Sequence, residues 1–370
     1  MKQLTTRQSC FMLFAVTSAM KLIVLPSLLI EQSQNAVWLV LLVMFLIDAT
    51  ALLLVFSLMK AFPEKTFSEL METALGKVCS KIVMCVLGIL FALKVAMLAR
   101  ECYEFYAETA YVDFSYLVYL VPLVLILGYL STRQIRVLGR SVEIFMYFIV
   151  LSIIMAILFS VSSLDIFAIM PLLPNGISPV AKSCFDYAFW FGDFLIVLFY
   201  LGNVKYEKQS LNKLFMAYSL AMMAVSVITI IHYSLFGIIS SSYKTSIVDI
   251  TEYIPRITNS GRFTWLIILF WPIAMLYAMA VYCKMSVHCF SKTFEVAEKG
   301  NRLLSYSVVA LSLCFLIGTF FSQNLMIDVI TKYLKYGVFA VQVGIPLLIP
   351  LVLVKNLKKE QLESEKDIQK

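Results

Sequence analysis

Residues 182–202 read KSCFDYAFWFGDFLIVLFYLG, a mostly apolar stretch that is interrupted at its centre by Gly192 and Asp193. About twenty apolar residues are enough to cross the hydrocarbon core of a bilayer as a helix. A charge at that depth costs roughly 2.5–3.5 kcal/mol unless it is paired or hydrated. The stretch therefore predicts a membrane-spanning helix in which the Asp193 carboxylate is paired or hydrated.

Further apolar stretches of similar length lie along the whole chain. The 370 residues are 61% hydrophobic and 14% charged, with a mean hydropathy of +0.89, which excludes a soluble domain. Helices are expected as the spanning elements because every backbone group must be hydrogen-bonded internally in hydrocarbon, and the stretches are too long for barrel strands. The ten predicted spans are 10–30, 37–59, 82–107, 115–131, 142–162, 182–202, 214–239, 263–284, 303–321 and 335–354.

The distribution of Lys and Arg predicts the orientation in the membrane. With the N-terminus in the cytoplasm, the inner segments hold 21 of the 30 Lys and Arg residues, as the positive-inside rule requires. The outer connections hold five, namely Lys244, Arg256, Arg262, Lys332 and Lys335. Both termini are thus expected to be cytoplasmic in a multi-pass protein of the cell membrane. This asymmetry explains the net charge of +7, so no nucleic-acid partner is expected.

The chain is expected to form one transmembrane domain over residues 1–354, followed by a charged cytoplasmic tail at 355–370. Two connections are longer than turns. Residues 62–80 carry apolar side chains at helical spacing, which predicts an interfacial helix on the inner membrane face. Residues 240–262 form the longest outer connection and are expected to contain another interfacial helix.

Ten spans with both ends inside divide into two halves of five spans with opposite orientation. Inverted repeats of this kind are typical of transporters whose solute site forms where the first span of each half breaks near the midplane. The first spans would be 10–30 and 182–202. The former carries Lys21 ahead of Pro26, which disfavours regular helix just before it, and the latter carries Asp193. The predicted fold is all-α, with ten helices in a 5+5 inverted repeat.

Four ionisable residues lie near the centres of four different spans: Lys21, Asp48, Lys94 and Asp193. Lys21, Asp48 and Asp193 are each about eleven residues into their spans, or roughly 16 Å at 1.5 Å per residue, and Lys94 is about twelve residues from the inner end of its span. One interpretation is a buried charge network that lines a polar cavity for a solute or a proton. The alternative is a set of buried ion pairs that only fixes the packing of the helices. The sequence leaves both open.

A second charged cluster follows on span 82–107 and contains Arg100, Glu101 and Glu104. Its place in the outer half of the membrane predicts either an acidic vestibule or a solvated helix end. Trp271 precedes Pro272, which kinks a helix by removing a backbone hydrogen bond, so this turn is a candidate for the lining of the cavity.

Several kinds of chemistry find no support in the sequence. The eight cysteines are scattered and contain no CxxC pair, so neither a zinc site nor a disulfide framework is indicated. No arrangement is typical of a catalytic triad or a phosphate-binding loop. We therefore expect no enzymatic activity, no cofactor and no metal.

A series of short motifs runs along the chain in a fixed order. They are QLTTRQ at 3–8, Leu25-Pro26, Pro63 with Thr66 and Gly76-Lys77, Arg100-Glu101, Arg133 with Gly139-Arg140 and Glu143, MPLLPNGISP at 170–179, and Phe191-Gly192-Asp193. In this order and spacing the chain resembles the spore germination permease family, the B subunits of endospore germinant receptors, within the amino acid/polyamine/organocation (APC) superfamily.

The resemblance implies a LeuT-like fold in which an amino acid or similar germinant binds between broken helices one and six, near helices three and eight. It also implies an A-type membrane subunit and a C-type lipoprotein as partners in the inner membrane of the spore. Two alternatives stay open. One is an amino-acid permease, with proton coupling through Asp193 or Asp48 as one form of it, and the other is a signalling or structural subunit without a ligand. By position, the ligand site comprises Thr17, Ser18, Ala19, Met20, Lys21, Lys94, Met97, Phe191, Gly192, Asp193 and Trp271.

The first span departs from the family pattern at one point. Relatives carry a glycine-rich break there, whereas this chain has Ser18-Ala19-Met20-Lys21. Lys21 would then either replace the exposed backbone amides as the partner of an anionic group or fill the site as a tethered cation.

Overall fold

The computed structural model shows an almost entirely helical chain. The only other secondary structure in the described residues is an isolated bridge, in which the Leu4 N–H donates to the Asn203 carbonyl at 2.9 Å beside Val204. The all-α prediction is thus confirmed for these residues. The structure describes residues 4–63, 65–110, 115–161, 164–165, 167, 170–173, 175–204, 209–253, 264–296, 302–317 and 323–368.

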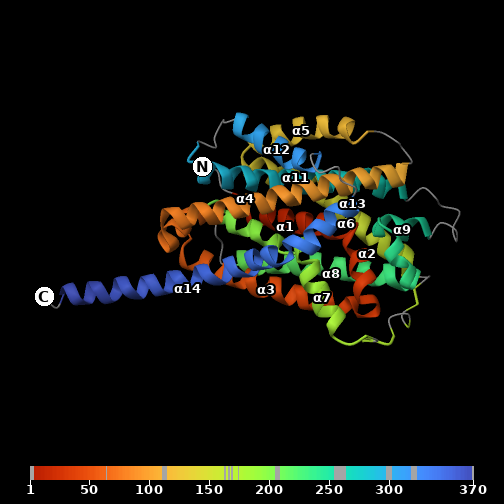
Figure 1. Cartoon of the computed structure of the whole chain (residues 1–370), viewed down its shortest axis with the longest axis horizontal. Coiled ribbons are helices and arrows are strands. Elements are labelled where there is room, and N and C mark those ends of the chain that lie inside the picture. The colour runs from red at the N-terminus through yellow and green to blue at the C-terminus, as the bar shows by residue number, and fades with distance from the viewer. Residues whose placement is uncertain are drawn as a thin grey trace.

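The longer helices run side by side along the molecule, and both termini lie toward the same end (Figure 1). These helices are α1 (Thr6–Lys21), α3 (Val37–Ala61), α4 (Phe67–Ala110), α5 (Tyr116–Thr132), α6 (Ile135–Ser160), α8 (Ser210–Phe236), α11 (Thr264–Thr293), α12 (Arg302–Ile317) and α14 (Lys335–Ile368). Shorter α-helices are α2 (Leu25–Ser33), α7 (Ser178–Asp186), α9 (Ser246–Tyr253) and α13 (Gln323–Val329). The remaining elements are the 3-10 segments η1 (Gln34–Ala36), η4 (Ala188–Trp190), η5 (Asp193–Tyr200) and η6 (Gly237–Ser242), and the π-helical segment η7 (Ile330–Leu334).

The helices identify a multi-pass membrane protein. Within the described residues, six helical segments are long and apolar enough to cross a membrane. A seventh is added if α7 and the following 3-10 segments, which are bent by 57°, form one broken span. Two shorter apolar helical stretches, Val118–Thr132 and Arg302–Leu313, coincide with further predicted spans.

The last predicted span begins later in the sequence than the helix does. We placed residues just before 335 in an outer connection, but helix starts at Gln323 and continues through η7 into α14. Met326 and Ile330 are buried at helical spacing, so this segment packs one face against the bundle. The π-helical turn lets the helix continue with a local change of register.

The two predicted interfacial helices fall on described helical segments. Residues 67–75 form the start of α4, and Gly76, with φ 76° and ψ 169°, interrupts that helix. In the outer connection the structure places α9, while residues 254–262 lie outside the described part of the chain. The tail at 355–370 continues α14 as far as Ile368.

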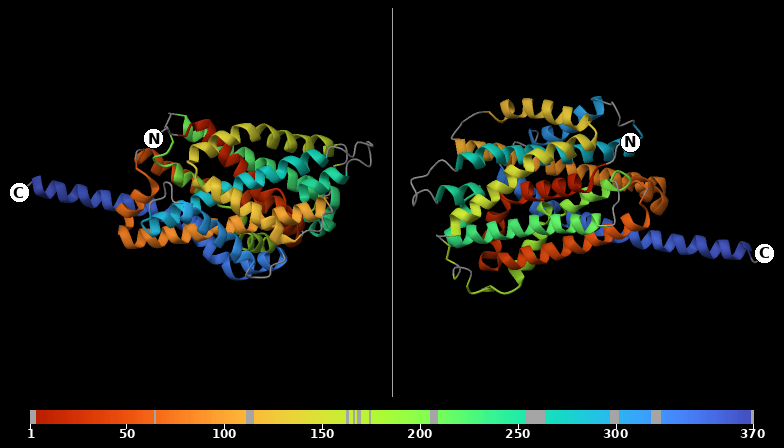
Figure 2. Two further views of the ribbon diagram at one scale, coloured as in Figure 1. Left: turned by 90° about the horizontal axis from the view of Figure 1, so that it is seen from above. Right: turned by 180° about the vertical axis from the view of Figure 1, so that it is seen from behind.

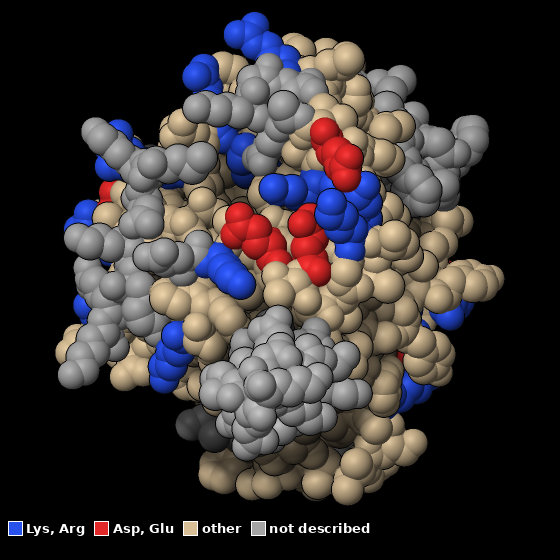
Figure 3. All heavy atoms as spheres, turned by 90° about the vertical axis from the view of Figure 1, so that its left-hand side faces the viewer, with Lys and Arg blue, Asp and Glu red and all other residues tan. Residues whose placement is uncertain are grey.

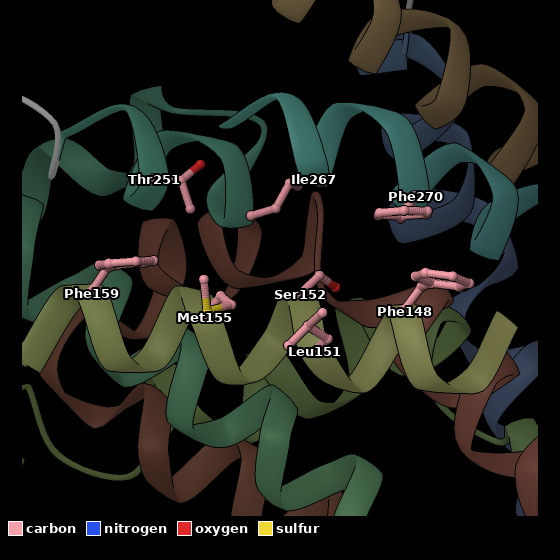
Figure 4. Close-up of a pocket in the computed structure, with 8 residues that line it drawn as sticks. All are labelled: Phe148, Leu151, Ser152, Met155, Phe159, Thr251, Ile267 and Phe270. Atoms are coloured by element: carbon pink, nitrogen blue, oxygen red, sulfur yellow. The ribbon is translucent and has the colours of Figure 1, made fainter. Parts of the chain in front are cut away.

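The centre of the bundle is α1, which packs against α6, α8 and α11 and against η5. The views in Figure 2 show it among the longer helices. A shallow crevice lies between α6, α9 and α11, where Phe148 and Phe270 stack with ring centroids 4.4 Å apart (Figure 4). Its volume of about 20 Å³ accommodates at most a single water, so it reflects packing and offers no room for a solute.

Candidate functional site

Two helices are interrupted inside the bundle, and each interruption carries an ionisable residue. Helix α1 ends at Lys21, and α2 begins at Leu25 with Pro26 in its first turn. The second interruption separates η4 from η5, at Phe191 and Gly192, directly before Asp193. The structure thus has breaks near the centres of both spans in which the sequence predicted them.

Gly192 makes the second interruption sterically feasible. Its φ of 73° is in the left-handed region that favours glycine. A Cβ atom at this position would also lie 2.6 Å from the side chain of Gln342. The chain therefore turns here only because residue 192 has no side chain.

The backbone groups that this turn releases from helical hydrogen bonding are bound by side chains. The Gly192 N–H donates to Asp48 Oδ2 at 3.1 Å, and Gln342 Nε2 donates to the Phe191 carbonyl at 2.9 Å. Buried backbone groups need such partners. Helices α3 and α14 therefore stabilise the interruption from two sides.

Asp193 is the hub of the buried centre. Its Oδ2 accepts a short hydrogen bond from the Lys21 ammonium, and its Oδ1 accepts from Lys94 Nζ at 2.8 Å and from the Tyr282 hydroxyl at 2.5 Å. Lys21, Lys94 and Asp193 have no exposed area. One carboxylate thus binds two cations, each contributed by a different helix.

The two ammonium groups have further partners that replace water. Lys94 Nζ donates to the Phe191 carbonyl at 2.8 Å, and it lies 5.5 Å from the ring centroids of Phe189 and Tyr282. Lys21 Nζ lies 5.3 Å from the centroid of the Phe191 ring. Aromatic faces attract cations, more strongly where water is excluded, so the rings add to the partners of both ammonium groups.

Asp48 joins this centre through the interrupted backbone. Besides the Gly192 N–H, it accepts a short hydrogen bond from the Tyr218 hydroxyl on α8. Its exposed fraction is 2%. The structure thus brings together all four ionisable residues that the sequence placed at one depth, as a closed network of pairs and hydrogen bonds. Both lysines pair directly with Asp193, and whether the network lines a solute site or only fixes the packing of the helices stays open.

Other residues of the predicted ligand site are also buried. Ala19, Met20, Met97 and Trp271 have no exposed area, and neither do Thr17 and Ser18. Among the described residues, Thr17 Oγ1, Ser18 Oγ and Trp271 Nε1 have no hydrogen-bond partner. Unpaired buried polar atoms are uncommon, and these three atoms retain the capacity to bind a polar group. The ligand-binding role of the predicted set stays a prediction.

Sequence reasoning missed three polar side chains of the network. Tyr218, Tyr282 and Gln342 each lie within a predicted span, where a polar group needs a buried partner just as a charge does. The prediction considered only ionisable residues and therefore left out these hydroxyl and amide groups.

Glu101 has a different environment from the predicted outer vestibule. It is 1% exposed, and its Oε1 accepts a hydrogen bond from Trp190 Nε1 at 3.0 Å. Its neighbour Arg100 pairs with Glu104 on the same helix. Glu101 is therefore a buried carboxyl group beside η4 and does not face a solvated vestibule.

Known proteins resemble this chain both in structure and in sequence. The crystal structure of MhsT in complex with L-phenylalanine matches this structure over 96% of this chain and 99% of that chain, with a TM-score of 0.54 and 12% sequence identity. The similarity shows the fold, so the chain is a multi-pass membrane protein of the LeuT type. It belongs to the spore germination protein family, whose model matches residues 3–324. No curated protein matches the sequence.

The family assignment confirms the resemblance seen in the sequence. The match begins at the QLTTRQ motif and extends through α12, so it includes both interrupted helices and the residues Lys21 and Asp193. The buried centre thus lies within the family domain.

Proposed function

We propose that this protein is the germinant-sensing B-type subunit of a spore germination receptor and that it binds a small amino-acid-type solute between the two interrupted helices. Membership of the spore germination family and the LeuT-type fold support this proposal. MhsT, with the same fold, was crystallised with an amino acid. The observation that carries the proposal is the buried pair of Lys21 and Asp193, one charge at each interruption.

The chemistry of this pair matches that of a zwitterion. A solute with an ammonium and a carboxylate group exchanges partners with it: the solute ammonium takes the place of Lys21 on Asp193, and the solute carboxylate then binds Lys21. This exchange brings no net charge into the bundle, which keeps the desolvation penalty low. The unpaired hydroxyls of Thr17 and Ser18 lie on the last turns of α1 and supply additional polar partners.

A thermal-shift screen of the purified full-length protein tests this function. We expect zwitterionic amino acids to raise the melting temperature, because a ligand at a hundred times its Kd stabilises the folded state by about 2.7 kcal/mol. The corresponding amines and carboxylic acids, which carry only one of the two charges, should have little effect. Lys21→Met should abolish the preference for the zwitterion. A stabilising sugar or nucleoside, with no response to any amino acid, would contradict the proposal.

One observation favours a second function, that of a signalling subunit without a ligand. The centre is closed: Lys21 and Lys94 bind Asp193, and Asp48 binds the Gly192 N–H and the Tyr218 hydroxyl. In that case no solute in the screen changes the melting temperature. A permease would share the binding response but would also accumulate labelled amino acid in proteoliposomes under a proton gradient. The proposal involves no catalytic step, cofactor or metal.

The proposed topology has ten spans in two inverted halves of five, with both termini in the cytoplasm. Cys79 is an exposed, free cysteine on the segment assigned to the inner face. We expect a membrane-impermeant maleimide to label it only after the membrane is permeabilised, whereas a cysteine introduced by Lys244→Cys should react in intact cells. The variant Cys79→Ser shows which part of the maleimide labelling belongs to Cys79, because that labelling is lost in the variant. Labelling of Cys79 in intact cells would contradict the orientation.

The receptor assignment also implies partners and a location. We propose an A-type membrane subunit and a C-type lipoprotein as partners in the inner membrane of the spore. Genes for both beside this one would support the assignment, and co-purification of the two proteins with the tagged chain tests it.

A further inference from the structure

A large groove lies on the outside of α1, away from the charge network. Its volume is about 740 Å³, and it opens between α1, α6 and α8. None of its lining residues belongs to the buried centre described above. The lining residues are Thr5, Thr6, Arg7, Cys10, Phe11, Phe14, Met146, Val150, Ile153, Ile154, Lys213, Met216, Ala217, Leu220 and Ala224.

The groove changes from polar to apolar along its length. Its polar end is formed by the start of α1, with Arg7, and by the first turn of α8, with Lys213. Thr6 Oγ1 and Ser210 Oγ are 2.8 Å apart, so these two helix starts meet. Beyond them the lining is formed by aliphatic, aromatic and methionine side chains, including Phe14 and Leu220.

The length of the groove matches one leaflet of a bilayer. On α8 the lining extends from Lys213 to Ala224, which is roughly 16 Å at 1.5 Å per residue. Half of a hydrocarbon core of about 30 Å is about 15 Å. The side of the groove that faces away from the bundle is open, since Met216 and Leu220 are 61% and 48% exposed. An acyl chain of the surrounding leaflet therefore reaches the apolar part directly.

The polar end carries an excess positive charge. Arg7 pairs with Glu143 at 2.6 Å, whereas Lys213 forms no ion pair with any residue in the described part of the chain. Lysine and arginine side chains are spread over the end of the molecule that carries both termini, with acidic side chains among them near its centre (Figure 3). A negatively charged group at this membrane surface would complement Lys213.

We propose that the groove binds an anionic phospholipid of the leaflet next to the N-terminus. The phosphate lies between Lys213 and Arg7, and one acyl chain follows α1 and α8 past Phe14 and Leu220. This site is independent of the proposed solute site, although both involve α1.

The test compares the binding of phosphatidylglycerol and of phosphatidylcholine with identical acyl chains to the delipidated full-length protein in detergent. Native mass spectrometry counts the lipid molecules that are bound to each protein molecule. We expect phosphatidylglycerol to bind more tightly. Lys213→Gln should weaken its binding about fivefold, the contribution of one cation near an anionic headgroup, and should leave phosphatidylcholine unchanged. Lys60→Gln, which removes an exposed lysine outside the groove, serves as the control.

A second pair of variants tests the apolar part. Ala224→Phe fills the groove and should weaken phosphatidylglycerol binding several-fold, whereas Met223→Phe, at a 58% exposed position outside the groove lining on the same helix, should not. Equal binding of phosphatidylglycerol to the wild type, Lys213→Gln and Ala224→Phe would overturn the proposal. Equally tight binding of glycerophosphoglycerol, the headgroup without acyl chains, would also overturn it, because the groove would then be a site for small anions.

Discussion

Replacing Asp193 by asparagine is expected to lower the free energy of unfolding by about 3–5 kcal/mol, the usual cost of removing one partner from a buried ion pair. Asp193 is the acceptor for both Lys21 and Lys94. Its neutralisation leaves two buried ammonium groups without their shared carboxylate. Asparagine has nearly the same shape, so the loss reflects charge more than packing.

The measurement is reversible unfolding of the purified protein in mixed micelles with increasing SDS. Asp328→Asn provides a matched control, because Asp328 pairs with Lys332 one helical turn away and both side chains are more than half exposed. Exposed pairs of this kind contribute about 0.3–0.5 kcal/mol. If Asp193→Asn costs no more than Asp328→Asn, Asp193 is not the hub of the network.

Replacing Lys21 by methionine is expected to cost less, about 1–3 kcal/mol. Methionine fills nearly the same volume but removes the ammonium group. Asp193 then keeps Lys94 and the Tyr282 hydroxyl as partners, so its charge stays compensated. The same unfolding experiment measures the loss, and Lys332→Met is the exposed counterpart. A loss for Lys21→Met larger than that for Asp193→Asn would contradict this order.

The sequence was most informative about the membrane-spanning helices, which long apolar stretches predict. Each of the ten predicted spans overlaps a described helix, because long apolar stretches have few alternatives to helix in a bilayer. The start of the last helix was wrong because residues 323–334 mix polar and apolar side chains. One face of this segment, with Gln323, Met326 and Ile330, is buried against the bundle, and a sequence window cannot detect this packing.

The centre of the site followed from one physical argument. A charge in hydrocarbon needs a partner, and for this reason the sequence alone predicts a site at Lys21, Asp48, Lys94 and Asp193. It could not specify that Asp193 binds both lysines or that Asp48 binds the Gly192 backbone. Those choices depend on the 57° bend after α7 and on the left-handed Gly192, which only the folded chain defines.

The central claim is that Lys21 and Asp193 join the two interrupted helices as one interacting pair. The most direct test is the unfolding free energy of the double variant Lys21→Met/Asp193→Asn beside both single variants. The account predicts that the double variant loses at least about 1 kcal/mol less than the sum of the single losses, within the range of coupling for contacting residues. The double variant at Asp328 and Lys332 should be nearly additive. Additivity within about 0.5 kcal/mol at Lys21 and Asp193 would contradict the account.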